Sequence, residues 1–374
     1  DLLNKETLEN IPRDIDAAYY LVHSMSASKD YKDLEEQCAI HFKEAMAKTK
    51  VQHVVYLSGI INESKLSKHL SSRKNVEEVL EQGKYNFTAL RAGIIIGSGS
   101  ASFEIIRDLV EKLPVMITPK WLNTCCQPIG IKDVIYFLSQ SILNTRTYNQ
   151  NFDIGGPDIL TYKEMLLGFA KERKLKRKIW IVPVMTPKLS SYWLYFVTST
   201  SYKLATSLVN SMKIEVVCRD TRINQILNAT PMAYQMSLEM AFKRIKNNEV
   251  LSSWKDAYAS SGLTDSISDF IEVPTFGCFK DERNRIVTNR EVCVNRIWSI
   301  GGKIGWYSGN WLWKLRGYLD KMVGGVGLRR GRTNPDTIQA GDALDFWRVL
   351  YANKEEGRLL LFAEMKLPGE AWLE

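Results

Sequence analysis

The sequence predicts an α/β domain built on a parallel sheet, followed by a smaller α+β domain. In the first half, compact apolar runs alternate with amphipathic helical patterns, which is typical of strand–helix–strand units. After residue 270, helical and strand patterns segregate instead. The chain has 374 residues, which exceeds the roughly 250–300 at which a single hydrophobic core stops growing. Two domains are therefore expected.

Three apolar runs carry the prediction of the parallel sheet. Residues 16–23, 51–58 and 87–96 each suit a strand that is buried on both faces. Amphipathic helices are expected between them, over residues 31–49 and 72–82. Right-handed crossovers would make the three strands parallel neighbours.

The alternation continues less regularly after these strands. We expect helices over residues 101–112 and 131–143, and short strands over 115–117 and 152–154. Thr161 and Glu164 have the spacing of a capping box and predict the start of the next helix. The basic run at 171–178 is interpreted as a solvated helix end followed by a turn.

A change of composition marks the boundary between the domains. Residues 187–213 are mostly helical in pattern and rich in aromatic residues, and 233–246 predict a last helix. Residues 252–269 are polar and rich in Ser, as domain linkers are. We therefore expect a first domain over 1–250, a linker over 251–269 and a second domain over 270–374.

The second domain reads as α+β. The pattern predicts strands over residues 276–288, 343–351 and 358–366, and helices over 290–299 and 311–323. The last two strands alternate apolar and polar residues and are joined by a turn ending at Gly357, which predicts an antiparallel hairpin. We expect Trp311 and Trp313 to pack toward this sheet.

Composition excludes several classes of protein and site. The formal net charge is +8, which over this length does not demand a nucleic acid partner, and we expect none. Six Cys without a CxxC pair, and four His, give no metal-site spacing, so no metal is expected. Such Cys usage predicts a reduced, cytoplasmic setting, and no apolar run is long enough to span a bilayer. The oligomeric state is not predicted.

A glycine-rich dinucleotide motif is missing from the sequence. Gly97 and Gly99 form a GxG pair, but Ser102 stands where the third small residue is needed. Gly325 and Gly327 form another pair outside any strand–helix–strand unit. The residues alone therefore give little support for a nucleotide site.

Seven segments, taken together, nevertheless resemble the atypical, extended, NmrA-like short-chain dehydrogenase/reductases. They are AAYYLVHSM (17–25), VVYLSGI (54–60), HLSSR (69–73), LRAGIIIGSGSASFE (90–104), LPVMITPKW (113–121), QPIGIKDV (127–134) and FDIGGPDILTY (152–162). The resemblance covers about residues 1–246. It implies a Rossmann-like fold truncated at its N-terminal strands, with the glycine motif before Asp1. It also implies NAD or NADP as cofactor and oxidoreductase activity on a small hydrophobic carbonyl or hydroxyl substrate.

The resemblance also implies a catalytic set. Ser58 matches the family's Ser, which orients the substrate carbonyl. By spacing, His69 and Arg73 take the places of the Tyr and Lys of the family's YxxxK motif. His69 could donate a proton near neutral pH, and Arg73 could hold the ribose of the cofactor. The structural alternative is that His69 caps its helix and Arg73 forms a surface ion pair.

Cofactor contacts are implied at the ends of the predicted strands. The implied residues are Asp1, Leu2, Val22, His23, Ser24, Leu57, Arg73, Ala92, Gly93 and Ile94. Gly93 has an alternative role, which is to permit close packing.

The second half resembles an uncharacterised START-like, polyketide-cyclase-like (SRPBCC) domain that accompanies such reductases in bacterial proteins. The segments that carry this are GWYSGNWLWKLRGYLDKMVGGVGLRRGR (305–332) and LDFWRV (344–349). The resemblance implies a curved antiparallel sheet around an apolar cavity and a long C-terminal helix, before which this sequence stops. The tryptophans at 306, 311, 313, 347 and 372 either line such a cavity or form ordinary core.

Two alternatives to an enzyme stay open at this point. A non-catalytic NAD(P)-binding sensor or scaffold would explain the loss of the usual Tyr and Lys. A carrier of an apolar ligand, such as a lipid or polyketide, would place the function in the second domain.

Overall fold

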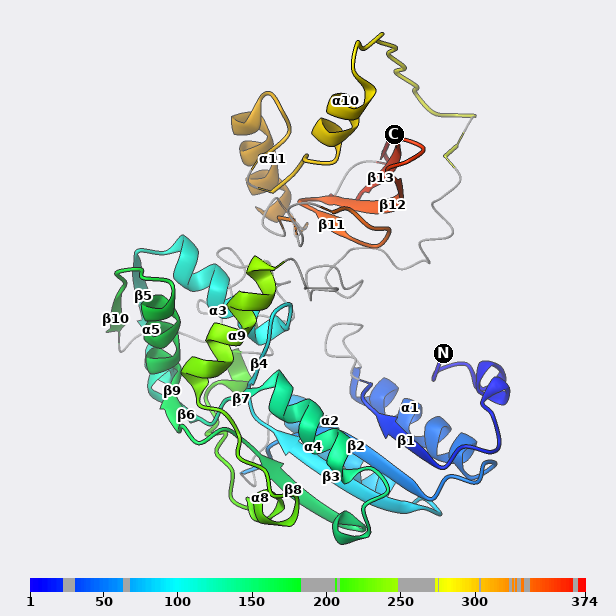
Figure 1. Ribbon diagram of the computed structural model, residues 1–374, viewed down its shortest axis with the longest axis vertical. Coiled ribbons are helices and arrows are strands. Elements are labelled where there is room, and N and C mark those ends of the chain that lie inside the picture. Colours follow the sequence, from blue (N-terminus) through cyan, green and yellow to red (C-terminus); the bar gives the residue numbers. More distant parts are fainter. Residues whose placement is uncertain are drawn as a thin grey trace. The chain divides into compact units, whose positions relative to one another are not determined.

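The computed structural model describes residues 1–22, 31–62, 68–182, 206, 209–247, 273–274, 276–302, 304–322, 325, 327, 331–332, 337–365 and 369–374. The structure divides into two compact units, with the break between Lys243 and Arg244. The predicted linker at 251–269 and most of the predicted helical segment at 187–213 lie outside the described residues. Each unit is therefore described by itself (Figure 1).

A four-stranded parallel sheet organises the first unit. Its order is β1 (Ala17–Tyr20), β2 (His53–Gly59), β3 (Asn86–Ala92) and β8 (Gln150–Ile154), and every neighbouring pair is parallel. The expectation that the first three strands are parallel neighbours is confirmed. The strand predicted over 87–96 divides, because β4 (Ile95–Ile96) leaves this sheet to pair with β7 (Ile129–Gly130).

Both faces of this sheet are covered by helices (Figure 1). On one face, α1 (Tyr31–Met46) and α2 (Lys68–Glu81) share a core with Val54 and Tyr56 of β2. On the other face, α4 (Ile131–Ser141) and α8 (Arg222–Ile226) share a core with Val55. Because successive β2 side chains enter opposite cores, this strand is apolar without alternation.

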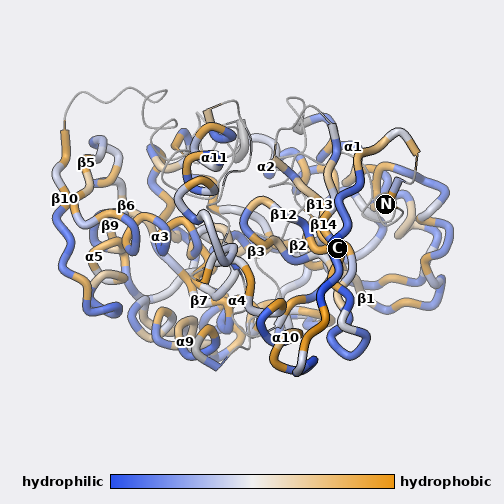
Figure 2. Tube along the Cα trace, turned by 90° about the horizontal axis from the view of Figure 1, so that it is seen from above, coloured by the Kyte–Doolittle hydropathy of each residue, from blue (hydrophilic) through white to orange (hydrophobic). Residues whose placement is uncertain are grey.

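A second group of elements completes the first unit. It comprises α3 (Ala101–Lys112), β5 (Val115–Pro119), the 3₁₀-helix η2 (Lys120–Asn123), α5 (Tyr162–Glu172), β10 (Lys178–Val182) and α9 (Tyr234–Lys246). The rings of Phe103, Phe169 and Phe242 join α3, α5 and α9, with centroids 5.0–5.6 Å apart. In Figure 2, α5 and α9 change between hydrophobic and hydrophilic colours along their length, as amphipathic helices do.

Both ends of α5 agree with the local sequence signals that predicted them. The Thr161 side chain accepts from the Glu164 backbone, and Glu164 returns a bond, so the capping box is confirmed. After α5 the basic run turns, with Lys174 at φ 53°, as interpreted. The strand that follows this turn, β10, was not predicted; it pairs with β5 in parallel. Short elements elsewhere in the unit are η1 (Lys5–Asn10), β6 (Cys125–Cys126), η3 (Thr145–Thr147) and β9 (Leu160–Thr161).

The second unit contains a four-stranded antiparallel sheet and two helices. The strands are β11 (Ala343–Leu344), β12 (Trp347–Asn353), β13 (Arg358–Ala363) and β14 (Trp372–Leu373), in that order. The helices are α10 (Arg290–Ile297) and α11 (Asn310–Met322). The hairpin of β12 and β13 is confirmed, and an α+β unit is therefore present.

Two strand predictions for the second unit are wrong. Residues 276–288 form no strand. Phe279 and Ile286 are fully exposed there, and no strand among the described residues supplies backbone partners. The strand predicted over 343–351 is interrupted at Asp345, whose φ of 54° turns the chain between β11 and β12.

The tryptophans of the second unit have different roles. Trp313 packs against the core of the unit, as expected, whereas Trp311 is 68% exposed, so the expectation for it was wrong. The rings of Trp306, Trp313 and Trp347 surround Phe346, with centroids 5.3–5.8 Å from it. These described rings therefore pack as core.

Candidate functional site

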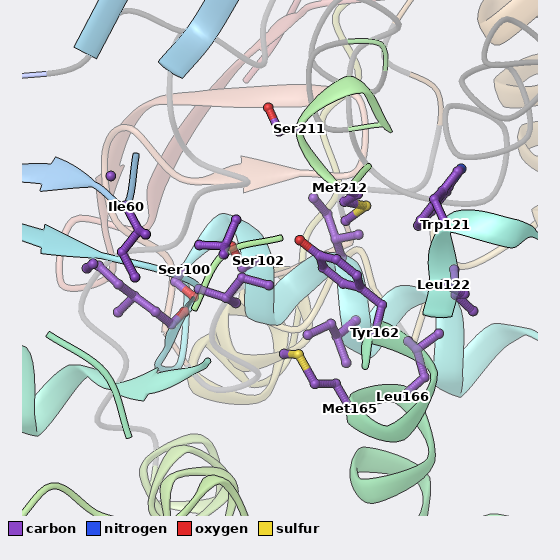
Figure 3. Close-up of a pocket in the computed structure, with 18 of the residues that line it drawn as sticks. Ile60, Ser100, Ser102, Trp121, Leu122, Tyr162, Met165, Leu166, Ser211 and Met212 are labelled. Atoms are coloured by element: carbon purple, nitrogen blue, oxygen red, sulfur yellow. Dashed lines mark hydrogen bonds between the residues drawn. The ribbon is translucent and has the colours of Figure 1, made fainter. Parts of the chain in front are cut away.

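A cavity of about 380 Å³ lies in the first unit, at the carboxyl ends of β2 and β3 (Figure 3). Its wall is formed by these strand ends, by α3, η2 and α5, and by the segment around Met212 and Val216. Most of the lining side chains are apolar, among them Ile60, Ile105, Leu122, Met165 and Leu166. In open α/β sheets, ligands bind at this edge.

Ser58 is the polar residue of β2 at this edge. This residue is 5% exposed and lines the cavity. Its Oγ lies beside the Tyr56 phenol but makes no hydrogen bond of standard geometry with the described residues. A buried hydroxyl without a partner costs free energy unless a ligand supplies the missing bond. Ser58 is therefore able to bind an oxygen of a molecule in the cavity.

Arg73, on α2, is the charged residue among those described in the cavity wall. Its Nη1 donates to the Leu57 carbonyl at 3.2 Å, which holds the guanidinium against the end of β2. Its Nε is buried and has no partner among the residues that the structure describes. The expected surface ion pair is absent from the described ion pairs, so Arg73 keeps a donor for a ligand.

His69 lies one helical turn before Arg73 in α2, but its side chain is outside the described part of the chain. The structure thus brings together Ser58 and Arg73 of the predicted catalytic set and leaves the placement of the His69 ring as a prediction.

The residues predicted to bind the cofactor fall into three groups. Leu57, Ala92, Gly93 and Ile94 line the cavity together with Arg73. Three others do not line the cavity. Asp1 is exposed, and Leu2 packs against the core that contains α1. Val22, two residues after the end of β1, is 45% exposed. His23 and Ser24 are outside the described residues.

Gly93 also has a packing role. A Cβ at this position would lie 2.9 Å from the Gln127 carbonyl oxygen and 3.3 Å from Val216 Cγ1. The Gln127 side chain in turn accepts from the Cys218 backbone at 2.9 Å and donates to the Gly156 carbonyl at 2.6 Å. These contacts hold Val216 in the cavity wall, so the packing alternative for Gly93 accounts for this glycine.

Two aromatic residues of the cavity wall were not identified from the sequence. Trp121 lies on η2 and Tyr162 opens α5, and their rings meet edge to face with centroids 6.3 Å apart. Burial raises the pKa of Tyr162, so its phenol stays protonated at neutral pH. The capping box at Thr161 predicts where α5 begins, but no sequence signal shows that Tyr162 faces a cavity.

The described residues contain neither a candidate metal site nor a helix that could span a membrane. They contain no cluster of three or more His, Cys, Asp or Glu side chains able to hold a metal ion. None of their helices is both long and apolar enough to cross a bilayer.

Comparisons with known proteins support the fold and leave the activity open. No curated protein sequence matches the chain. Residues 278–374 match a family described as a protein of unknown function (DUF2867), and nothing in that match identifies the second unit as START-like.

Solved structures similar to the chain include epimerases and reductases at low identity. A nucleoside-diphosphate-sugar epimerase from Staphylococcus aureus is 14% identical, with a TM-score of 0.52 over 64% of this chain and 81% of that one. Triphenylmethane reductase from Citrobacter sp., complexed with NADP(H), is 12% identical, with a TM-score of 0.51 over 64% and 81%. An NADPH-dependent quinone oxidoreductase from Escherichia coli, complexed with NADPH, is 12% identical, with a TM-score of 0.50 over 65% and 82%. At these identities the likeness shows the fold, and the chain therefore has a Rossmann-like α/β fold.

Proposed function

We propose that the protein is an NAD(P)-dependent oxidoreductase acting on a hydrophobic carbonyl or hydroxyl compound. The observation that carries the proposal is an apolar cavity at the carboxyl edge of a parallel sheet. Ser58 Oγ and Arg73 Nε lie at this edge, and neither these atoms nor Trp121 Nε1 elsewhere in the wall has a hydrogen-bond partner among the described residues. The apolar wall suits a hydrophobic substrate, because burial of apolar surface supplies most of its binding free energy. Two of the similar structures carry NADP(H) or NADPH, which supports the choice of cofactor.

The residues at this edge fit a nicotinamide cofactor. Arg73 is a fixed cation whose free Nε can donate to a ribose hydroxyl or a phosphate oxygen. Leu57, Ala92 and Ile94 offer apolar wall beside it. When bound, the nicotinamide supplies or accepts a hydride.

The protein's own residues would hold the substrate and move a proton. Ser58 donates a hydrogen bond from its buried Oγ to the substrate carbonyl oxygen, which orients and polarises it. His69, with an unperturbed pKa of about 6.5, is the proposed proton donor to that oxygen.

The proposal is tested by cofactor oxidation with aromatic ketones in the intact protein and in His69→Ala. We expect His69→Ala to lower kcat by about 100-fold or more while cofactor affinity is kept, because loss of a general acid typically costs this much. His41→Ala is the matched control, since its Nδ1 lies 2.7 Å from the Leu2 carbonyl oxygen and it is outside the cavity wall. Unchanged turnover in His69→Ala would rule out its catalytic role.

A non-catalytic sensor is the alternative, and the loss of the usual Tyr and Lys at positions 69 and 73 favours it. A sensor would bind the dinucleotide, turn over no carbonyl compound and be indifferent to His69→Ala. If the intact protein binds neither NAD(H) nor NADP(H), both the enzyme and the sensor are rejected.

A further inference from the structure

The α5 side of the cavity carries no charge among its described residues. Figure 3 places Tyr162, Trp121 and Leu122 across the cavity from Ile60, which follows Ser58 at the end of β2. The described charged residue of the wall is Arg73, which is bonded to the β2 end through Leu57. A molecule that reaches from Ser58 to the α5 side must therefore be uncharged there, because a buried charge without a partner is strongly disfavoured.

Two donors lie on this apolar side: the Trp121 Nε1–H, which is buried without a described partner, and the hydroxyl of Tyr162. Figure 3 shows its ring leaving α5 with the hydroxyl oxygen directed into the cavity. That hydroxyl makes no hydrogen bond with any residue that the structure describes.

Three other tyrosine hydroxyls of the first unit already have partners within the protein. Tyr234 donates to the Met165 carbonyl at 2.9 Å, Tyr85 to the Leu80 carbonyl at 2.8 Å, and Tyr56 lies 3.5 Å from the Arg73 carbonyl. Buried Tyr hydroxyls normally find a partner. Tyr162 differs from these three because its hydroxyl opens onto the cavity, where a bound molecule can accept from it.

The Tyr162 ring is held in place by its surroundings. The capping box fixes the residue before it, since Thr161 and Glu164 bond each other reciprocally at 2.7–3.1 Å. The Trp121 ring packs edge to face against it, with an interplanar angle of 86°. A donor held in this way imposes a direction on the oxygen that it binds.

We propose that Tyr162 donates a hydrogen bond to a second oxygen of the substrate, at the side of the cavity away from Ser58. The substrate class is then an uncharged, mostly apolar molecule with one carbonyl or hydroxyl to react and a second acceptor oxygen across its ring or chain. The reacting end rests on the function proposed above; the acceptor oxygen at Tyr162 does not depend on the cofactor.

Two ketones that differ by one oxygen test this inference. 1,4-Diacetylbenzene has two opposed carbonyls, and 4-ethylacetophenone replaces one of them by a methylene. Their dissociation constants are measured by calorimetry in the wild-type chain, in Tyr162→Phe and in Tyr136→Phe. The last is the control, because its hydroxyl donates to the Leu227 carbonyl at 3.0 Å and it does not line the cavity.

We expect the wild-type chain and Tyr136→Phe to bind the diketone about tenfold more tightly than the monoketone, as one added hydrogen bond in a buried site predicts. In Tyr162→Phe the ratio should fall to about twofold, which is the statistical preference for a symmetric ligand.

The inference is overturned if the wild-type ratio is already about twofold, if Tyr162→Phe leaves it unchanged, or if neither ketone binds. Equal weakening of both ketones in Tyr162→Phe would also overturn it, because Tyr162 would then hold the first oxygen. If the ratio behaves as expected but NAD(P)(H) does not bind, the cavity inference survives and the proposed oxidoreductase function fails.

Discussion

Two arginines, the fully buried Arg348 of the second unit and the half-buried Arg73 of the first, show how differently the molecule uses a polar group. Arg348, in β12, is 0% exposed, and it donates to both Glu364 carboxylate oxygens, at 2.8 and 3.4 Å, and to the Gly341 carbonyl at 2.6 Å. Within the described part of the chain, the Arg73 side chain makes one hydrogen bond, to the Leu57 carbonyl, and its buried Nε has no partner.

The difference separates structural from ligand-binding polar groups. A buried charge whose partners all lie in the protein adds to the cost of unfolding, and removing one partner exposes the full penalty on the other. A buried donor without a protein partner lowers stability and is useful only when a ligand completes it. On this comparison, Ser58 is a ligand-binding polar group like Arg73. His53 of β2 is a structural polar group like Arg348, because both of its ring nitrogens are hydrogen-bonded within the protein.

The largest effect is expected from Arg348→Met. This change leaves the Glu364 carboxylate buried without its cation, which should lower the free energy of unfolding of the second unit by about 3–5 kcal/mol. Denaturant unfolding followed by tryptophan fluorescence measures it. Arg358→Met is the control, because the Arg358–Glu374 pair is about half exposed and should leave the midpoint nearly unchanged. Equal midpoints for the two variants would show that the buried pair is not structural.

A smaller effect is expected from His53 as the pH falls. The Leu143 N–H donates to Nδ1 at 2.9 Å, so Nε2 carries the proton that faces Thr88 Oγ1, also at 2.9 Å. Burial lowers the pKa of His53 from 6.5 to about 4. The unfolded chain therefore binds the proton first, and stability is lost as the pH falls from 6.5 toward 4, by about 3 kcal/mol in all.

This loss is measured by urea unfolding of the first unit at several pH values between 7 and 4. His53→Gln keeps a donor and an acceptor but cannot titrate, so its stability should fall less over the same range. Parallel pH curves for the wild-type chain and His53→Gln would contradict the role assigned to His53.

The smallest change in stability is expected at Ser58. Since its Oγ has no partner, Ser58→Ala should change the free energy of unfolding by less than about 1 kcal/mol, and in the stabilising direction. Turnover of a ketone should nevertheless fall at least tenfold, because the donor to the carbonyl oxygen is lost. A large loss of stability with turnover intact would place Ser58 among the structural polar groups.

The parts of the fold that the sequence predicted well are those fixed by local patterns or by burial on both faces. The runs that became β1, β2 and β3 are apolar because helices cover both sides of the sheet, and α3 runs over Ala101–Lys112 as its pattern predicts. Residues 276–288 have a strand-like pattern but no partner strand, and a pattern cannot show whether a partner exists.

The sequence predicted one side of the candidate site, at the ends of β2 and β3, and missed the other. Ser58, Arg73 and Ala92–Ile94 were implied by the family resemblance, and the structure places all of them in the cavity wall, at the carboxyl edge of the parallel sheet. Trp121 and Tyr162 enter the cavity from η2 and α5, about 50–100 residues further along the chain, and tertiary packing alone brings them there.

Calorimetric titration of NADP(H) and NAD(H) into the intact protein and into Arg73→Met tests the central claim most directly. Lys74→Met is the control, because Lys74 follows on the same helix and its side chain is 55% exposed. The account predicts binding of one of the two dinucleotides, weakened about tenfold or more in Arg73→Met, as the loss of a charge-assisted hydrogen bond implies, and unchanged in Lys74→Met. Absence of binding, or equal affinities for the wild-type chain and Arg73→Met, would contradict it.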